Sequence, residues 1–277
     1  MFSKNKLRFK NLLFNRVSTP PSKISIIKIL GIPAAQVTME QTMLCIEEFV
    51  NSGESHLIVT LGAEMVMAAR KKHELREMLK KASLIVPDGG GILWAAKKLG
   101  DPLKEKVAGI ELIEKISSQS GKKNWNLFFL GGKPGTAEKA VQNLRNKFPD
   151  MKIVGSYHGY FNHKEIPPIL KNEKIDILFV GMGFPYQENW ILNHCQALQI
   201  PVGIGVGGSF DVLSGELKRA PKWMINLNLE WFYRLIQEPR RWKRMLVIPQ
   251  FMILVYALSI KKLFSDKTEE EKENRIT

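Results

Sequence analysis

Short apolar runs bounded by turn residues alternate with amphipathic stretches through the middle of the chain. The apolar runs predict strands over residues 57–61, 84–86, 125–130, 152–156, 175–180 and 201–205. Apolar positions spaced three and four apart predict helices over residues 39–51, 63–81, 90–99, 110–118, 136–148 and 186–198. This alternation indicates an α/β fold with a Rossmann-like, mostly parallel sheet and helices on both faces.

The net charge of +14 is concentrated at the two ends of the chain. Residues 1–30 hold seven Lys or Arg and no acid, and residues 216–264 hold ten against three Glu. Residues 31–215 are almost balanced, with 21 bases and 19 acids. We therefore divide the chain into a basic N-terminal segment (1–30), an α/β core (31–215), a basic, aromatic, helical C-terminal appendage (216–264) and an acidic, disordered tail (265–277).

Both basic ends also carry apolar side chains among their charges. This combination favours an anionic membrane surface over nucleic acid as a partner, although solvated charged faces would also explain the N-terminal end. The longest apolar run, residues 245–258, contains Pro249. It is shorter than the ~20 residues of a spanning helix, so it indicates a helix that lies on a membrane or in a core. No apolar h-region follows the basic N-terminus, and we expect a cytoplasmic protein at the inner face of the cell membrane.

Candidate chemistry lies where the predicted strands end, because open α/β folds bind ligands at that edge. Asp88 follows one strand, where it either faces a cleft or caps the next helix. Gly131 and Gly132 open a helix in the manner of a phosphate-binding turn, although a tight structural turn explains them nearly as well. Gln187 can donate and accept hydrogen bonds, which suits sugar hydroxyls, or it is an exposed residue in the first turn of a helix.

The segment from Gly203 to Arg244 joins consecutive glycines to acidic, basic and aromatic residues. Consecutive glycines let backbone amides approach an anion, and arginines supply the donors that a diphosphate needs. Arg234, Arg241 and Arg244 would share one face of an unbroken helix. Pro239 is placed to interrupt that helix.

Together these motifs resemble the WecG/TagA/CpsF glycosyltransferases, bacterial enzymes that add N-acetylmannosamine or a related sugar to a lipid-linked acceptor. The resemblance covers about residues 31–244. It rests on Thr60 and Glu64, Pro87-Asp88-Gly89, Val107-Ala108-Gly109, Gly131-Gly132, Gly181-Met182-Gly183 with Pro185 and Gln187-Glu188, and the segment from Gly203 to Arg244.

The resemblance implies inverting transfer of a hexosamine-type sugar, N-acetylmannosamine or its uronic acid, from a UDP-sugar to a polyprenyl-diphosphate-linked sugar in cell-surface polysaccharide biosynthesis. It implies no metal and no cofactor, and the chain agrees in having no Asp-x-Asp pair. It also implies that the appendage docks on the membrane and completes the active site. A core without its appendage would expose apolar surface, which is compatible with a homo-oligomer.

Roles for individual residues follow from the same resemblance. Asp88 is expected to take the proton from the acceptor hydroxyl, with Thr60 beside it as a second catalytic residue. Substrate contacts are expected from Gln187, Glu188, Lys106, Arg234, Arg241 and Arg244. Nucleotide contacts are expected from Gly131, Gly132, Tyr157, Gly207, Gly208 and Asp211.

Two departures from the family pattern concern the identity of the substrates. Gly62 stands where many relatives carry Asn, while Lys106 and Glu111 replace an Arg and an Asp. Transfer of another hexose such as glucose stays open on the sequence, as does a non-catalytic membrane-surface protein that binds nucleotides. A nicotinamide-dependent oxidoreductase is a more remote alternative, because the glycine pattern is not the full dinucleotide fingerprint.

Overall fold

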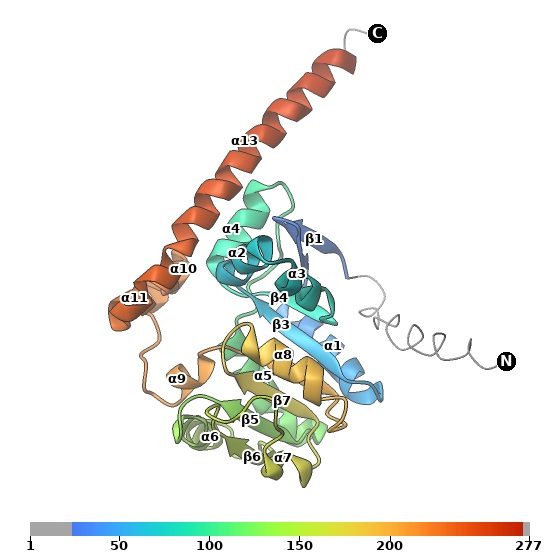
Figure 1. The fold of residues 1–277 in the computed structure, drawn as a ribbon, viewed down its shortest axis with the longest axis vertical. Coiled ribbons are helices and arrows are strands. Elements are labelled where there is room, and N and C mark those ends of the chain that lie inside the picture. Colours follow the sequence, from blue (N-terminus) through green and yellow to red (C-terminus); the bar gives the residue numbers. More distant parts are fainter. Residues whose placement is uncertain (1–23, 274–277) are drawn as a thin grey trace, which may run out of the picture.

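The computed structural model describes residues 24–273, without the side chains of residues 226, 241, 243, 244 and 262–273. At its centre is a six-stranded parallel sheet with the strand order β4–β3–β8–β7–β5–β6 (Figure 1). The strands are β3 (His56–Leu61), β4 (Leu84–Pro87), β5 (Leu127–Gly131), β6 (Ile153–Tyr157), β7 (Ile177–Gly181) and β8 (Val202–Gly205). All the predicted strands are therefore confirmed.

Helices cover both faces of the sheet, as the sequence predicts. One core cluster includes residues of α1 (Met39–Asn51), α5 (Gly109–Lys123), α6 (Thr136–Lys147) and α9 (Ser209–Leu213). The other includes residues of α2 (Ala63–Lys71), α3 (His73–Lys80), α4 (Gly90–Lys98), α7 (Pro168–Lys171) and α8 (Tyr186–His194). Phe128 and Phe129 belong to different clusters, because neighbouring residues of a strand point to opposite faces. Burial on both faces explains why the strands are continuous apolar runs.

A β-hairpin precedes the sheet and was not predicted. Strands β1 (Ile26–Ile29) and β2 (Ile32–Ala35) pair antiparallel, with buried Ile27 and Ile29 alternating with exposed Ile26 and Lys28. Leu30 and Gly31 both have positive φ, as a two-residue hairpin turn requires. The boundary predicted after residue 30 falls inside this hairpin, because the alternation of isoleucines outweighs the basic composition of the segment.

Two predicted elements differ from the observed ones. The helix predicted over residues 63–81 is two helices, α2 and α3, separated by extended backbone at Lys72. Residues 265–273, part of the tail predicted to be disordered, are helical, because α13 (Val247–Glu273) continues through them; the rest of that tail lies outside the described residues. Lys and Glu have high helix propensity, so an acidic composition does not end a helix that is already formed.

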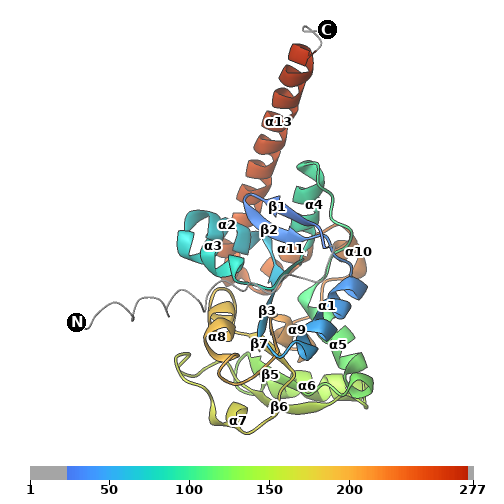
Figure 2. The same cartoon turned by 90° about the vertical axis from the view of Figure 1, so that its right-hand side faces the viewer.

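The appendage wraps back onto the core. It consists of α10 (Lys222–Asn226), α11 (Glu230–Gln237), η1 (Pro239–Arg241), α12 (Trp242–Met245) and α13. Buried residues Ile248, Phe251 and Val255 form one stripe of α13, which contacts α2 and α4, and the rest of the helix projects beyond the core (Figures 1 and 2). Within the described residues, no helix has the length and apolar character needed to cross a bilayer.

Candidate active site at the carboxyl edge of the sheet

The ends of β3, β4 and β8 meet around Gly109, the first residue of α5. A Cβ atom at Gly109 would lie 3.4 Å from Ser209 Oγ, 3.5 Å from Thr60 Cγ2 and 3.6 Å from Asp88 Oδ2. These side chains come from three separate strand ends, and the parallel topology brings them to one point. The structure therefore brings together the two residues predicted to be catalytic, Asp88 and Thr60, at the edge where such folds bind ligands.

Asp88 is partly buried at this edge. Its backbone N–H donates to Leu61 O at 2.9 Å, and its Oδ2 accepts from Gly109 N at 3.2 Å. Burial raises the pKa of Asp88 from 3.8 to about 6, opposed by the Gly109 hydrogen bond and reinforced by the negative charge of Glu230. Asp88 is not the side-chain cap of α4, whose N-terminus at Gly89 has no such hydrogen bond. A carboxylate with this pKa is ionised at neutral pH and is a stronger base than an ordinary Asp.

Thr60 is almost fully buried beside Asp88. Its Oγ1 donates to Gly205 O at 2.8 Å, which joins β3 to β8 through a side chain as well as through the backbone ladder. The hydroxyl keeps acceptor capacity toward the site.

Lys106 is paired with the appendage. Its Nζ donates to Glu230 Oε2 at 2.9 Å, and only 16% of the Lys106 side chain is exposed. Glu230 is the first residue of α11, so this ion pair connects the loop before α5 to the appendage. Because Glu230 also acts on the pKa of Asp88, the appendage contributes charge to the catalytic edge.

Gln187 follows β7 at the carboxyl edge and is 1% exposed. Its Oε1 accepts from Gly183 N at 3.1 Å and from Gly207 N at 3.0 Å, and its Nε2 donates to Glu188 Oε1 at 2.8 Å. The amide therefore ties together the glycine turns after β7 and β8. It is not an exposed residue of the helix, because its side chain is buried.

Glu188 is fully buried beside Gln187. Burial raises the pKa of Glu188 to about 7, opposed by the hydrogen bond from Gln187. Its Oε2 has no hydrogen-bond partner among the described residues. In this arrangement Glu188 supports Gln187, because it is buried and accepts the hydrogen bond from the Gln187 amide.

The glycine turn after β5 is tightly closed. Gly132 N donates to Gly181 O at 3.0 Å, and a Cβ at Gly131, whose φ is +142°, would lie 2.4 Å from the same oxygen. The Gly132 amide is therefore already used within the turn. Tyr157, at the end of β6, is paired in register with Leu130 and presents a ring stacked on His158 at the same edge.

The glycine turn after β8 lies against Arg234 of α11. Arg234 Nη2 lies 3.5 Å from Gly208 O and 3.9 Å from Asp211 Oδ2. Arg234 also forms an ion pair with Glu238, with 3.6 Å between Nε and Oε2. The structure thus places Gly208, Asp211 and Arg234 together, whereas the Gly207 amide is taken by Gln187.

The two other appendage arginines are not on the same helix as Arg234. Helix α11 ends at Gln237 and η1 begins at Pro239, so the proline interrupts the helix and the shared face does not form. The side chains of Arg241 and Arg244 lie outside the described residues.

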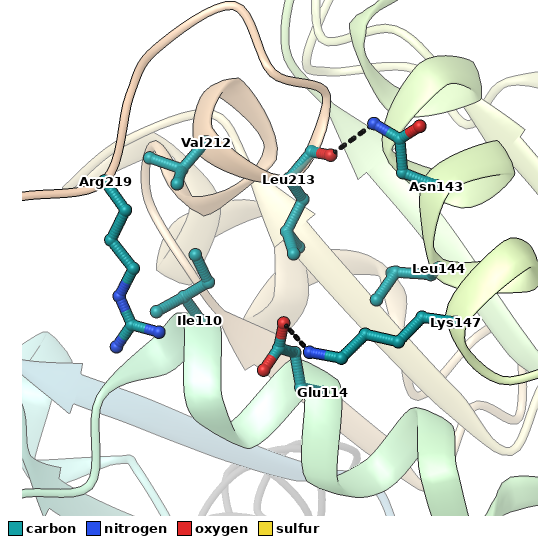
Figure 3. Close-up of a pocket in the computed structure, with 8 residues that line it drawn as sticks. All are labelled: Ile110, Glu114, Asn143, Leu144, Lys147, Val212, Leu213 and Arg219. Atoms are coloured by element: carbon teal, nitrogen blue, oxygen red, sulfur yellow. Dashed lines mark hydrogen bonds and ion pairs between the residues drawn. The ribbon is translucent and has the colours of Figure 1, made fainter.

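A hollow of about 210 Å³ lies between α5, α6 and α9, away from the strand ends described above (Figure 3). Figure 3 shows its polar groups already paired: Lys147 Nζ lies 2.8 Å from Glu114 Oε1, and Asn143 donates to Leu213 O at 2.8 Å. Arg219, which also lines it, forms an ion pair with Glu111. The hollow is therefore closed by the protein's own interactions, and the carboxyl edge is the better candidate site.

Comparison with known proteins identifies the family of this chain. Residues 27–264 match the sequence profile of the glycosyl transferase WecG/TagA/CpsF family. The chain belongs to this family. The match includes the core, the hairpin and most of the appendage, so the resemblance based on motifs is confirmed, and the chain is a glycosyltransferase.

The family includes curated relatives that are similar to this chain along most of their length. One, from Bacillus subtilis strain 168, is 34% identical over 83% of this chain and 91% of its own. Another, from Staphylococcus aureus strain MW2, is 35% identical over 82% of this chain and 90% of its own. Both are named N-acetylglucosaminyldiphosphoundecaprenol N-acetyl-beta-D-mannosaminyltransferase.

Two residues of this candidate site were missed from the sequence. Ser209 borders the same point as Asp88, and its position directly after the Gly207-Gly208 turn was a usable signal. Glu230 pairs with Lys106 across 124 residues of sequence, and no local pattern indicates such a pairing.

Proposed function

We propose that this enzyme transfers N-acetylmannosamine from a UDP-sugar to the terminal sugar of a polyprenyl-diphosphate-linked acceptor, in the assembly of a cell-surface polysaccharide. The names of the relatives support both the sugar and the lipid-linked N-acetylglucosamine acceptor, and they favour N-acetylmannosamine over glucose. The observation that carries the mechanism is the meeting of Asp88, Thr60 and Ser209 around Gly109.

In the proposed reaction, an acceptor hydroxyl attacks the anomeric carbon of the donor while Asp88 takes its proton. UDP leaves from the opposite face, so the configuration inverts in a single displacement. Asp88 suits this role because its raised pKa increases its basicity and leaves it ionised at neutral pH. Lys106 and Arg234 are cations at this edge that could stabilise the departing diphosphate.

We also propose that the reaction needs no divalent metal ion. The sequence has no Asp-x-Asp pair, and the part of the chain described by the structure holds no group of three or more His, Cys, Asp or Glu able to bind a metal. Full activity in the presence of EDTA would support this proposal. A requirement for added Mg²⁺ or Mn²⁺ would contradict it.

We further propose that the appendage docks on the anionic inner face of the cell membrane. Large apolar side chains are exposed along it, including Trp223, Leu227, Ile236, Trp242, Ile253 and Tyr256. Basic residues of the same segment would attract anionic lipid. Cosedimentation with phosphatidylglycerol vesicles, compared with phosphatidylcholine vesicles, tests this. Equal binding to both kinds of vesicle, or binding to neither, would contradict the proposal.

The reaction itself is tested by mass spectrometry of the products. The full chain is incubated with a polyprenyl-diphosphate-linked N-acetylglucosamine and a mixture of UDP-sugars. We expect the mass of one N-acetylhexosamine to be added and UDP to be released only when the acceptor is present, and we expect the same product when UDP-N-acetylmannosamine is the sole donor but not when an isomer of equal mass is. Addition of another hexose would contradict the donor assignment, whereas the absence of any transfer would contradict the proposed function.

A further inference from the structure

An apolar groove of about 740 Å³ lies between α2, α3, the start of α8 and the start of α13. Its apolar lining comes mainly from Met67, Leu75, Met78, Phe184, Tyr186 and Val247. In both views α2 and α3 lie side by side, above α8 (Figures 1 and 2). The volume is within the range of sites that hold small organic ligands.

The groove connects the catalytic edge to the appendage. Phe184 lies in the turn that follows β7, and Tyr186 is the first residue of α8. Glu64 lies in the first turn of α2, directly after β3, the strand that carries Thr60. Val247 is the first residue of α13. The lining therefore includes residues from the edge where Asp88 lies and from the helix that carries exposed Ile253 and Tyr256.

The composition of the groove favours an apolar occupant. Tyr186 is 61% exposed and Leu75 is partly exposed, although neighbouring Met67 and Met78 are buried. Ordered water needs several polar partners, which a wall of Met, Leu and Phe does not offer. Polar residues, among them Lys71 and Glu64, also line the groove. This pattern suits a hydrocarbon chain that ends in a charged group.

We propose that this groove holds the first isoprene units of the acceptor's polyprenyl chain. The proposal rests on the proposed function, which requires a lipid-linked acceptor. A chain that leaves the membrane beside α13 would follow the groove to the carboxyl edge, and its terminal sugar would then reach Asp88. Contact with isoprene units would add to acceptor binding in proportion to the apolar area removed from water.

A chain-length comparison tests the groove. Two acceptors are compared in the same detergent: N-acetylglucosamine diphosphate with a polyprenyl tail and the same compound with a short alkyl tail. The measured ratio is kcat/KM for the polyprenyl acceptor divided by kcat/KM for the alkyl acceptor. We expect Leu75→Gln to lower this ratio by roughly tenfold, as when one large aliphatic side chain loses an apolar contact. The matched control is Leu44→Gln, because Leu44 is 59% exposed on α1, which covers the other face of the sheet. It should leave the ratio unchanged.

An unchanged ratio in Leu75→Gln would overturn the proposal, whether activity stays at the wild-type level with both acceptors, falls equally with both, or is accompanied by an altered oligomeric state. The last would make the groove an interface between copies of the chain. A polyprenyl diphosphate with a diazirine in its first isoprene unit gives a readout without activity. We expect crosslinks in α3 or at Tyr186, and labelling elsewhere alone would contradict the proposal. Wild-type protein that is inactive with both acceptors would refute the proposed function, while the crosslinking result would still decide the groove.

Discussion

Lys106 Nζ lies 2.9 Å from Glu230 Oε2, so a core loop and the first residue of α11 form an ion pair next to Asp88. The pair connects the position of the appendage to the charge at the catalytic edge. The Glu230 carboxylate raises the pKa of Asp88 and the Lys106 ammonium lowers it, although burial remains the largest cause of the shift.

This relationship predicts how pH affects the reaction. The wild-type kcat/KM is expected to rise with pH through about 6, as Asp88 loses its proton and becomes a base. Glu230→Gln removes a negative charge, so the pKa of Asp88 should fall and the rise should move to lower pH. The control is Glu114→Gln, which breaks an ion pair away from this edge. A pH profile that stays in place in Glu230→Gln would contradict the electrostatic coupling.

Asp88→Asn is expected to lower kcat by roughly 10²–10⁴, the usual contribution of a general base. It should not lower stability. The folded-state pKa of about 6 exceeds the ordinary value of 3.8, so ionised Asp88 disfavours the folded state at higher pH, and Asn removes that cost.

Two measurements check this prediction, transfer to a lipid acceptor and thermal unfolding at pH 8. Asp101→Asn, at an exposed position, is the matched control and should change neither. Near-normal turnover of a folded Asp88→Asn variant would remove Asp88 from the role of base.

Gln187→Ala is expected to lower both stability and activity. The substitution leaves the Gly183 and Gly207 N–H groups without their acceptor, and each unsatisfied buried group costs about 1–3 kcal/mol. Chemical denaturation measures the loss. Exposed Gln196→Ala should have no comparable effect, and a Gln187→Ala variant with wild-type stability but weakened sugar binding would instead favour a direct contact with substrate.

Phe251→Asp is expected to detach α13 from the core. Phe251 is fully buried in the stripe that contacts α2 and α4, and an unpaired charge there is strongly unfavourable. The uncovered apolar surfaces should then promote association between copies of the chain. Light scattering and limited proteolysis measure this, with exposed Met252→Asp as the control.

Truncation after Gly215 should leave a core with little transferase activity, because it removes the appendage. A fully active core would exclude a catalytic role for the appendage.

The sheet could be predicted from the sequence because most of its strands are short apolar runs that end at a glycine or an acid, although β6 ends at Tyr157 before a histidine. The hairpin was not predicted because the segment of residues 1–30 was classified by its basic charge. The alternation of Ile27 and Ile29 with outward-facing residues is the pattern that indicates its first strand. The edge was predicted for the same reason as the sheet: polar residues such as Asp88 directly follow buried strands.

The use of each side chain at this edge could not be predicted in the same way. Gln187 was predicted to bind sugars because its amide can donate and accept hydrogen bonds. The sequence gives no sign that the N–H of Gly207, twenty residues later, donates to its Oε1. Glu230 is a similar case, because its partner is fixed by how α11 folds back onto the core. Pairings between distant residues depend on the packed chain, whereas strand ends depend on local pattern.

Helix α13 has 27 residues and is therefore about 40 Å long, while only its first turns are fixed to the core. A helix of this length, held at one end, transmits the orientation of its projecting part to the core. A surface that restrains its projecting part also sets the tilt and the height of the core above that surface. Acceptors anchored in the same surface would then reach Asp88 only from one direction and only when their tether matches that height, so the helix would select substrates by reach before any side chain touches them.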